Sequence, residues 1–256
     1  MNYRLTIIIP VYNEQESLNR LFKALLEYLK FTPVKSKILF IDDGSTDDSP
    51  RIIMEFCDKN NHFEYATLRS NKGLSTALKV GIDLCNTHYL GYMDADLQTS
   101  PKDFMLYFSH LDEYTMVNGI RLDRKDKFIK KMSSKIANGF RRLMINDGIV
   151  DTCCPLKVVE TSYAQKIPFF KGMHRFMPAL IQLQGGKVKQ VEVSHYPRIT
   201  GTPKYHLFNR VFGPLLDTMA FMWMKRQWIS YEIKKIDIGP GRKSENTHLE
   251  TTQLNE

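Results

Sequence analysis

The chain has 256 residues, 43% hydrophobic and 25% charged, as expected of a soluble globular protein with one large domain or one domain plus an extension. No apolar stretch approaches the roughly 18–20 residues needed to span a bilayer, and the four cysteines have the spacing of neither a zinc site nor a disulfide framework. The net charge of +8 favours an anionic partner, whether nucleic acid, lipid headgroups or a phosphorylated substrate.

The first half of the chain alternates predicted strands with predicted helices. The first strand covers residues 5–9 and is closed by Pro10, after which Asn13 and Glu16 predict an N-cap and capping box for a helix over about 14–30. Further strands are predicted at 37–41, 64–68, 89–93 and 114–119, and further helices at 49–59, at 73–84 and after the N-cap Ser100. This order predicts an α/β fold with a mostly parallel sheet and helices on both faces.

The second half of the chain is less regular. The pattern predicts a basic helix near 128–144, a helix near 174–184, an edge strand at 188–195 and a mobile loop at 196–205. Residues 206–228 are apolar and aromatic, with a break at Gly213-Pro214. We therefore expect a main domain over 1–205, a helical extension over 206–236 and a disordered tail over 237–256.

Two acidic clusters follow apolar runs that are typical of buried parallel strands. Asp42-Asp43-Gly44-Ser45 follows the run at 38–41, and Asp94-Ala95-Asp96 follows the run at 89–93. The carboxyl edge of such a sheet is where ligands bind. Gathered carboxylates repel one another unless something positive lies between them, and a divalent cation carrying a nucleotide diphosphate meets that need.

Asp94 and Asp96 are spaced so that both can approach one cation from a turn, and Gln98 can add an oxygen ligand. These hard ligands suit Mg²⁺ or Mn²⁺, although Asp-x-Asp is also common in surface turns. An acid at the first cluster can accept hydrogen bonds from a nucleobase, although an ordinary Asx turn explains the cluster as well. Tyr12 at the same edge can stack on the base, although a packed core aromatic explains this residue as well. No glycine-rich dinucleotide or Walker-type loop is present.

Together these motifs resemble the family 2 glycosyltransferases, which have the GT-A fold and transfer sugars from nucleotide donors with inversion. The matching segments are IIPVYNE at 8–14, DDGSTD at 42–47, NKG at 71–73 and DADLQ at 94–98. Within this family the chain is most similar to the dolichyl-phosphate mannose synthase and polyprenyl-phosphate hexosyltransferase branch, through residues 119–121, Asp151, 174–178 and 197–205. The resemblance covers roughly residues 5–210.

The resemblance implies a role for individual residues. The nucleotide would be held by Pro10, Tyr12, Glu14, Asp42, Asp43, Lys72 and Asp94. The metal, Mg²⁺ or Mn²⁺, and the diphosphate would be held by Asp94, Asp96 and Gln98. The acceptor phosphate would be surrounded by Arg121, Lys130, Lys131, Arg198 and Lys204, and the expected catalytic residues are Asp96, Arg121 and Asp151. The chain departs from the branch at Pro203, where a serine is usual, and at 153–157, where a glycine-containing stretch is usual, so these residues leave the acceptor open.

The distribution of charge favours one class of acceptor. A hydroxyl acceptor needs a general base, whereas a lipid phosphate is already an anion and needs cations to position it. Nine basic and two acidic residues between Arg121 and Arg142 supply +7 of the net +8, although a solvated helix face would explain such a block as well. We expect transfer of a mannose- or glucose-type hexose from GDP-mannose or a UDP-hexose to a polyprenyl or dolichyl phosphate, with Asp151 orienting cations or the sugar. The alternative is transfer to a polysaccharide or glycolipid hydroxyl in cell-envelope synthesis, with Asp151 as the base.

A lipid acceptor requires contact with a membrane surface. Apolar residues at helical spacing over 207–219, followed by Trp223, Lys225-Arg226 and Trp228, are typical of an in-plane amphipathic helix. Packing on the domain, or on a second subunit of a homo-oligomer, explains the same pattern. Because the cysteines indicate a reducing cytoplasm, we expect a peripheral enzyme on the cytoplasmic face of a membrane. Nucleic acid is disfavoured as a partner, since the aromatic residues do not interleave with the basic ones.

Overall fold

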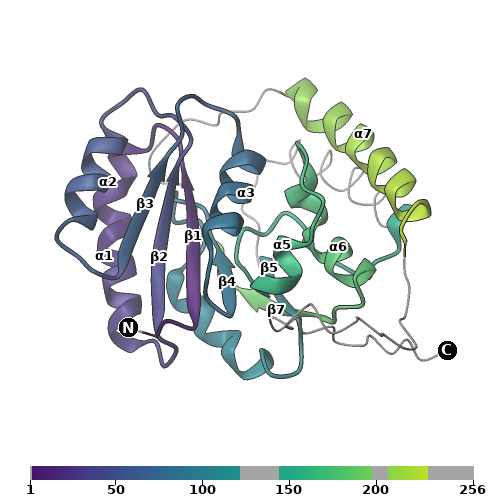
Figure 1. Ribbon diagram of the computed structural model, residues 1–256, viewed down its shortest axis with the longest axis horizontal. Coiled ribbons are helices and arrows are strands. Elements are labelled where there is room, and N and C mark those ends of the chain that lie inside the picture. The colour runs from purple at the N-terminus through teal and green to yellow at the C-terminus, as the bar shows by residue number, and fades with distance from the viewer. Residues whose placement is uncertain (1, 122–143, 198–206, 230–256) are drawn as a thin grey trace, which may run out of the picture.

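The structure, a computed structural model, describes residues 2–121, 144–197 and 207–229. Its centre is a seven-stranded sheet with the order β3-β2-β1-β4-β6-β5-β7 (Figure 1). The strands are β1 (Leu5–Val11), β2 (Ser36–Asp42), β3 (Phe63–Thr67), β4 (Tyr89–Tyr92), β5 (Met116–Arg121), β6 (Lys157–Glu160) and β7 (Val188–Val193). Among the described strands only β6 runs antiparallel to its neighbours, so the expected mostly parallel sheet is confirmed.

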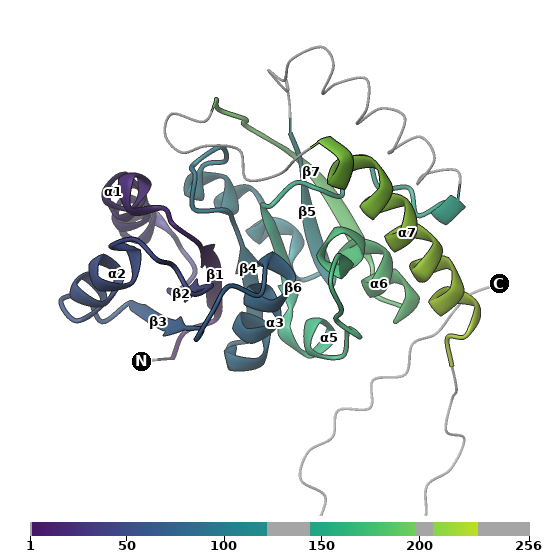
Figure 2. The same cartoon turned by 90° about the horizontal axis from the view of Figure 1, so that it is seen from above.

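Helices cover both faces of the sheet (Figure 2). The helices are α1 (Gln15–Phe31), α2 (Ser49–Cys57), α3 (Leu74–Leu84), α5 (Thr161–Gln165), α6 (Met177–Leu183) and α7 (Leu207–Arg226), with 3₁₀-helices η1 (Pro101–Leu106), η2 (Phe108–His110) and η3 (Met173–Phe176). The alternation of β1 divides the core, because Ile7 and Ile9 pack in a cluster with α1 and α2, and Ile8 packs in a second cluster with α3 and α6.

Strand register brings the acidic turns to one edge of the sheet. Val11 pairs with Asp42 in the parallel β1–β2 ladder, and Ile8 pairs with Tyr92 in the parallel β1–β4 ladder. The turns after these three strands therefore leave the sheet on the same side, as the sequence predicted.

Two expectations for the start of the chain are wrong. Pro10 does not close β1, which continues to Val11. The Ile8 carbonyl oxygen accepts from Met93 N, so Ile8 faces β4, and Pro10, two residues further on, faces the same side. The last paired residue of β4 is Tyr92, opposite Ile8, so the N–H that a proline lacks is not needed for the ladder at this point. The capping box is also absent. Asn13 lies outside the helix at a φ of 50°, and the N-cap is Glu14, with no side-chain cap.

The second half differs from the sequence patterns in three places. Strand β6 was not predicted, because it has four residues and begins with a lysine. The predicted helix at 174–184 is divided into η3 and α6. Helix α7 continues through Gly213-Pro214, since a proline removes only one backbone donor from a helix of 20 residues. The expected basic helix at 128–144, apart from its last residue, and the loop from residue 198 onward lie outside the described residues.

Helix α7 packs against the domain through η3. Arg175 forms an ion pair with Asp217 of α7 at 2.6 Å, and the ring of Phe176 stacks on Phe221 with 5.2 Å between centroids. Lys225 at the end of the helix donates to the carbonyl oxygen of Ile145. One face of α7 therefore contributes to the core, while the boundary expected at residues 205–206 lies outside the described residues.

Candidate active site

The turns that follow β1 and β2 are joined by side-chain hydrogen bonds. Asn13 N donates to Ser45 Oγ at 2.9 Å, and Asn13 Oδ1 accepts from Thr46 N at 2.8 Å. These contacts fix the segment after β1 against the acidic turn after β2. The structure thus brings together the expected nucleotide-binding residues of the two segments, which are Pro10, Tyr12, Glu14, Asp42 and Asp43.

Asp43 connects this edge to a third loop. Its Oδ1 accepts from Lys72 N at 2.8 Å, and its Oδ2 accepts from Gly73 N at 2.7 Å. The adjacent Gly44 has a φ of +67°, and a Cβ on it would lie 2.5 Å from the backbone carbon of Ser70. Only glycine fits this close approach, so the loop that carries Lys72 is held beside the acidic turn.

Asp42 has a different environment from Asp43. It is only 1% exposed, and its Oδ1 accepts from Ser45 N at 3.2 Å. Its Oδ2 is buried and has no hydrogen-bond partner among the described residues. An unsatisfied buried carboxylate oxygen is costly, so this atom is well suited to accept a hydrogen bond from a ligand.

The turn after β4 holds the second acidic cluster. Tyr92 Oη donates to Asp94 Oδ1 at 2.6 Å, and Gln98 N donates to Asp96 Oδ1 at 3.1 Å. Leu97 between them has a φ of 56°, a conformation uncommon for a residue with a side chain, which reverses the chain tightly. Asp96 is buried, and the turn that it shares with Asp94 and Gln98 carries carboxylate and amide oxygens at the end of the strand.

These oxygens fit a hard divalent cation such as Mg²⁺ or Mn²⁺. No group of three or more His, Cys, Asp or Glu residues that could hold a metal occurs within the described ranges. A cation at this turn would therefore take Asp94, Asp96 and Gln98 from the protein and its other ligands from water or a bound phosphate.

Arg121 and Asp151 form a buried ion pair at the end of β5. Arg121 Nε lies 2.7 Å from Asp151 Oδ2, Nη2 lies 2.9 Å from Oδ1, and the two side chains are 11% and 9% exposed. Burial alone would lower the pKa of the Arg121 guanidinium, but its hydrogen bonds with Asp151 and the attraction of that carboxylate outweigh burial and raise the pKa above its usual range. The Arg121 guanidinium is therefore held in its charged form.

The sequence motifs gave no role to two buried groups, Lys157 and His174, although residues 174–178 are one of the matching segments. Lys157, the first residue of β6, donates to Asn118 and to the backbone that follows Asp151. The sequence marked residues 153–157 only as an unusual stretch, and a lysine in an apolar strand was the available signal. His174 of η3 accepts or donates through Nδ1 with Ser75 Oγ at 2.8 Å. Burial, with the nearby Arg175 charge, lowers the pKa of His174 to about 3.

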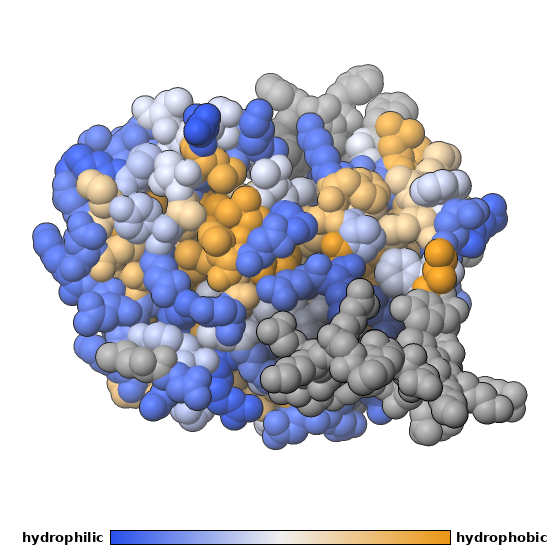
Figure 3. All heavy atoms as spheres, viewed as in Figure 1, coloured by the Kyte–Doolittle hydropathy of each residue, from blue (hydrophilic) through white to orange (hydrophobic). Residues whose placement is uncertain are grey.

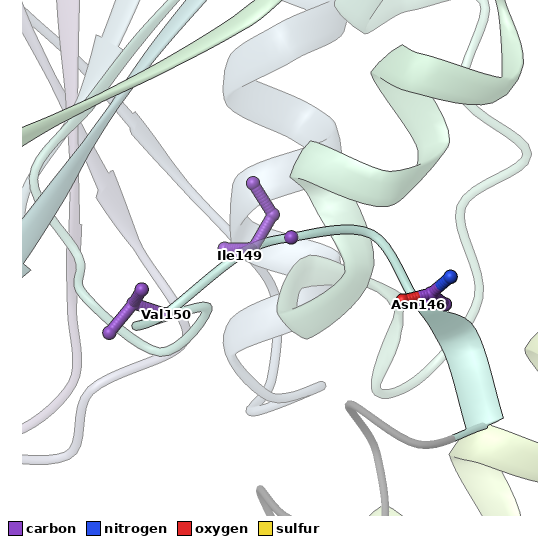
Figure 4. Close-up of a pocket in the computed structure, with 4 residues that line it drawn as sticks. Asn146, Ile149 and Val150 are labelled. Atoms are coloured by element: carbon purple, nitrogen blue, oxygen red, sulfur yellow. The ribbon is translucent and has the colours of Figure 1, made fainter.

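The remaining expected acceptor residues, Lys130, Lys131, Arg198 and Lys204, lie outside the described residues. The surface hollow nearest to Asp151 in sequence has a volume of about 180 Å³ and is lined by Asn146, Gly148, Ile149 and Val150 (Figure 4). It contains no ionisable side chain and no expected site residue. Among the described residues, the acidic turns and the Arg121–Asp151 pair therefore remain the candidate site.

Comparison with known proteins identifies the family and the fold. A family model described as "Glycosyl transferase family 2" matches residues 6–167. A dodecaprenyl-phosphate galacturonate synthase of Rhizobium johnstonii is 28% identical over 228 residues, which cover 87% of this chain and 67% of the relative.

Two solved structures have similar folds. A mannosyltransferase from Pyrobaculum calidifontis in complex with GDP-Man and Mn²⁺ has a TM-score of 0.63 and 14% identity, covering 86% of this chain and 64% of that one. Glucosyl-3-phosphoglycerate synthase from Mycobacterium tuberculosis, in complex with Mn²⁺ and UDP-glucose, has a TM-score of 0.63 and 13% identity, covering 85% and 79%. This chain thus spans about two thirds of the length of the Rhizobium relative and of the Pyrobaculum enzyme. The similar structures confirm the expected GT-A fold.

Proposed function

This chain belongs to the family 2 glycosyltransferases, and we propose that it transfers a hexose or hexose-derived sugar from a nucleotide donor to a polyprenyl or dolichyl phosphate. The named activity of the Rhizobium relative, a dodecaprenyl-phosphate sugar synthase, supports the acceptor class. The observation that carries the proposal is the buried ion pair of Arg121 and Asp151.

The ion pair favours a phosphate over a hydroxyl acceptor. Both Asp151 oxygens accept hydrogen bonds from Arg121, so a proton taken from an acceptor hydroxyl would be taken against the attraction of that cation for the carboxylate. A phosphate oxygen needs no base, because it is already an anion at neutral pH. Arg121 instead supplies positive charge at the end of β5, where it can orient an anionic acceptor. An oxygen of that phosphate attacks the anomeric carbon as the bond to the nucleoside diphosphate breaks, with inversion.

We place the donor at the edge formed by β1, β2 and β4. Pro10, Tyr12, Glu14 and the Asp42-Asp43 turn would bind the nucleoside, and Lys72 would lie beside the phosphates. Asp94, Asp96 and Gln98 would hold Mg²⁺ or Mn²⁺. When bound, the cation neutralises negative charge on the departing diphosphate. Both solved structures named above contain Mn²⁺ and a nucleotide sugar, which supports this arrangement.

The outer face of α7 supports peripheral attachment to a membrane. Leu216, Met219 and Trp223 are 64%, 54% and 68% exposed and follow one another at helical spacing. Apolar side chains are visible on the outer side of α7 at the upper right of Figure 3. Lys225 and Arg226 follow at the end of the helix, where they can meet anionic headgroups. Among the described residues, no helix has the length and hydropathy needed to cross a bilayer.

A donor screen tests the proposal. The purified protein is incubated with a short polyprenyl phosphate, Mg²⁺ or Mn²⁺, and in turn GDP-mannose, UDP-glucose or UDP-galacturonate. Nucleotide release and the mass of the lipid product are then measured. One donor should give a glycosylated lipid, and the Asp94→Ala/Asp96→Ala variant should give none. Nucleotide release that requires a sugar or glycolipid hydroxyl instead would favour the cell-envelope alternative, with Asp151 as its base.

A further inference from the structure

Lys157 lies at the centre of a buried polar cluster behind the Arg121–Asp151 pair. The residue is 2% exposed. Its ammonium donates to Asn118 Oδ1 at 2.8 Å, to the carbonyl oxygen of Thr152 at 3.2 Å and to the carbonyl oxygen of Cys154. A protonated lysine has three N–H donors, so these three acceptors use all of them.

Two of the three acceptors belong to the segment that presents Asp151. Thr152 and Cys154 are one and three residues after Asp151, so the bonds to their carbonyl groups fix the backbone on its C-terminal side. Asn118 Nδ2 donates to the Asp151 carbonyl oxygen at 3.0 Å. Lys157 and Asn118 therefore hold the Asp151–Cys154 backbone at three carbonyl groups, while the Asp151 side chain faces Arg121.

Close packing leaves this segment little freedom to shift. A Cβ on Gly119 would lie 2.7 Å from Cys154 Sγ and 2.7 Å from Tyr107 Oη. Tyr107 Oη in turn donates to the carbonyl oxygen of Leu156 at 3.1 Å. The segment from Asp151 to Lys157 is thus packed directly on β5, the strand that carries Arg121.

A lysine at this position carries a cost. Among the described residues no carboxylate bonds to its ammonium. Burial lowers the pKa of Lys157, which reflects the cost of keeping a charge there. A methionine would fill a similar volume without the charge, but it would leave the three oxygens without their donor. The lysine does what no apolar residue can, because it bonds to three oxygens at once.

We infer that Lys157 is a positioning residue for glycosyl transfer, which fixes the Asp151–Cys154 segment so that Asp151 holds Arg121 in the orientation that receives the acceptor. The inference rests on the proposed acceptor role of Arg121. It assigns to Lys157 no contact with either substrate.

Lys157→Met is the first test, with Lys37→Met as a matched control. Lys37 is also a buried strand lysine, but it lies on β2 and pairs with Glu64 at 2.8 Å, away from the Asp151 segment. Lys157→Met should raise the KM for the lipid phosphate about ten- to hundred-fold, because a small misplacement of an orienting group is costly, and it should leave the donor KM unchanged. Lys37→Met should leave both KM values unchanged. Equal changes in the two KM values of Lys157→Met would overturn the inference.

Thiol labelling followed by peptide mass spectrometry tests the same role without any activity. Cys154 is fully buried within the held segment, whereas the buried Cys57 and Cys85 lie elsewhere and report on global opening. In Lys157→Met, Cys154 should react about ten times faster than in the wild type, with Cys57 and Cys85 unchanged, as local release of one segment requires. An unchanged rate at Cys154 would overturn the inference.

A second variant covers the case in which all three thiols of Lys157→Met react faster together. Asn118→Leu removes the β5 side chain that bonds to Lys157 and to the Asp151 carbonyl oxygen, and it keeps a similar side-chain shape. Selective acceleration at Cys154 would then support the inference, and general acceleration would show that the cluster serves only the fold. If the wild type makes no lipid product, the proposed function fails, and the labelling still decides whether Lys157 holds the segment.

Discussion

Arg121 and Asp151 are 30 residues apart in the sequence and meet as a buried bidentate ion pair, with an additional hydrogen bond from Arg121 N to Asp151 Oδ2 at 3.3 Å. The pair joins the end of β5 to the segment that precedes β6. Each partner therefore fixes the other, and a role for either in the reaction depends on both.

Replacement of Asp151 by asparagine separates the two roles open to this residue. Asp151→Asn leaves the Arg121 charge buried without its partner, which should destabilise the fold by about 3 kcal/mol. If Asp151 orients Arg121, the variant should keep measurable turnover, with an acceptor KM raised about ten-fold and an unchanged donor KM. Steady-state kinetics with each substrate varied in turn, together with urea denaturation, measures both effects. Complete loss of turnover with intact donor binding would instead assign Asp151 as the base.

Asp43→Asn should weaken donor binding. The carboxylate accepts from the backbone N–H groups of both Lys72 and Gly73, and an asparagine can accept only one of these bonds. The loss of one charge-assisted bond should cost about 2 kcal/mol of stability and raise the donor KM about ten-fold, with no change in the acceptor KM. The control is Asp83→Asn, which removes an exposed carboxylate paired with Lys79. An unchanged donor KM in a folded Asp43→Asn protein would contradict the assignment of this edge to the donor.

The buried imidazole of His174 predicts a loss of stability in acid. Its pKa falls from 6.5 to about 3 on folding, chiefly because burial disfavours the imidazolium. The contribution of neutral His174 to the free energy of unfolding is therefore complete above pH 6.5 and is lost as the pH falls toward 3. At pH 5 the loss is about 2 kcal/mol. In urea denaturation at pH 7 and pH 5, the wild type should lose this amount, and His174→Asn should lose less because its amide does not titrate. His88→Asn, at an exposed position, should behave as the wild type. Equal acid sensitivity in all three proteins would remove His174 as the cause.

The exposed face of α7 should enter an anionic bilayer. With Trp228→Phe as the background, Trp223 is the only tryptophan, and its fluorescence should shift to the blue on addition of vesicles containing phosphatidylglycerol. Replacing Leu216 and Met219 by serine should weaken vesicle binding at least about ten-fold, since each buried apolar side chain contributes about 1.5–3 kcal/mol. Leu84→Ser, at an exposed leucine on α3, is the control. Absence of the shift, with a dimer in sedimentation analysis, would assign the face to a second subunit.

The first half of the fold could be predicted because its signals are local. Apolar runs that stop at acidic turns marked β2 and β4 correctly, and the alternation with helices fixed their parallel order. The start of α1 could not be predicted in the same way. Asn13 has the chemistry of an N-cap, but its side chain bonds across to Thr46, a tertiary contact that no local pattern contains.

Part of the candidate site was also readable from the sequence. The motifs identified the turns of Asp43 and Asp94, and parallel register brings such turns together. The motifs named Arg121 and Asp151 but not their contact, because the short antiparallel β6, which the sequence did not predict, pairs with β5 and brings the preceding Asp151 segment to it. Lys157 was missed for a related reason, since its three acceptors come from β5 and from backbone carbonyl groups.

The most direct measurement of the central claim compares two acceptors of equal chain length, a polyprenyl phosphate and the corresponding polyprenol, with the donor found in the screen. Mass spectrometry of the lipid fraction identifies the product. We expect a sugar joined to the lipid through a phosphodiester with the first acceptor and no glycosylated lipid with the second. Glycosylation of the polyprenol would contradict a phosphate acceptor. So would a rate of nucleotide release that is the same with the phosphate, with the alcohol and without any lipid.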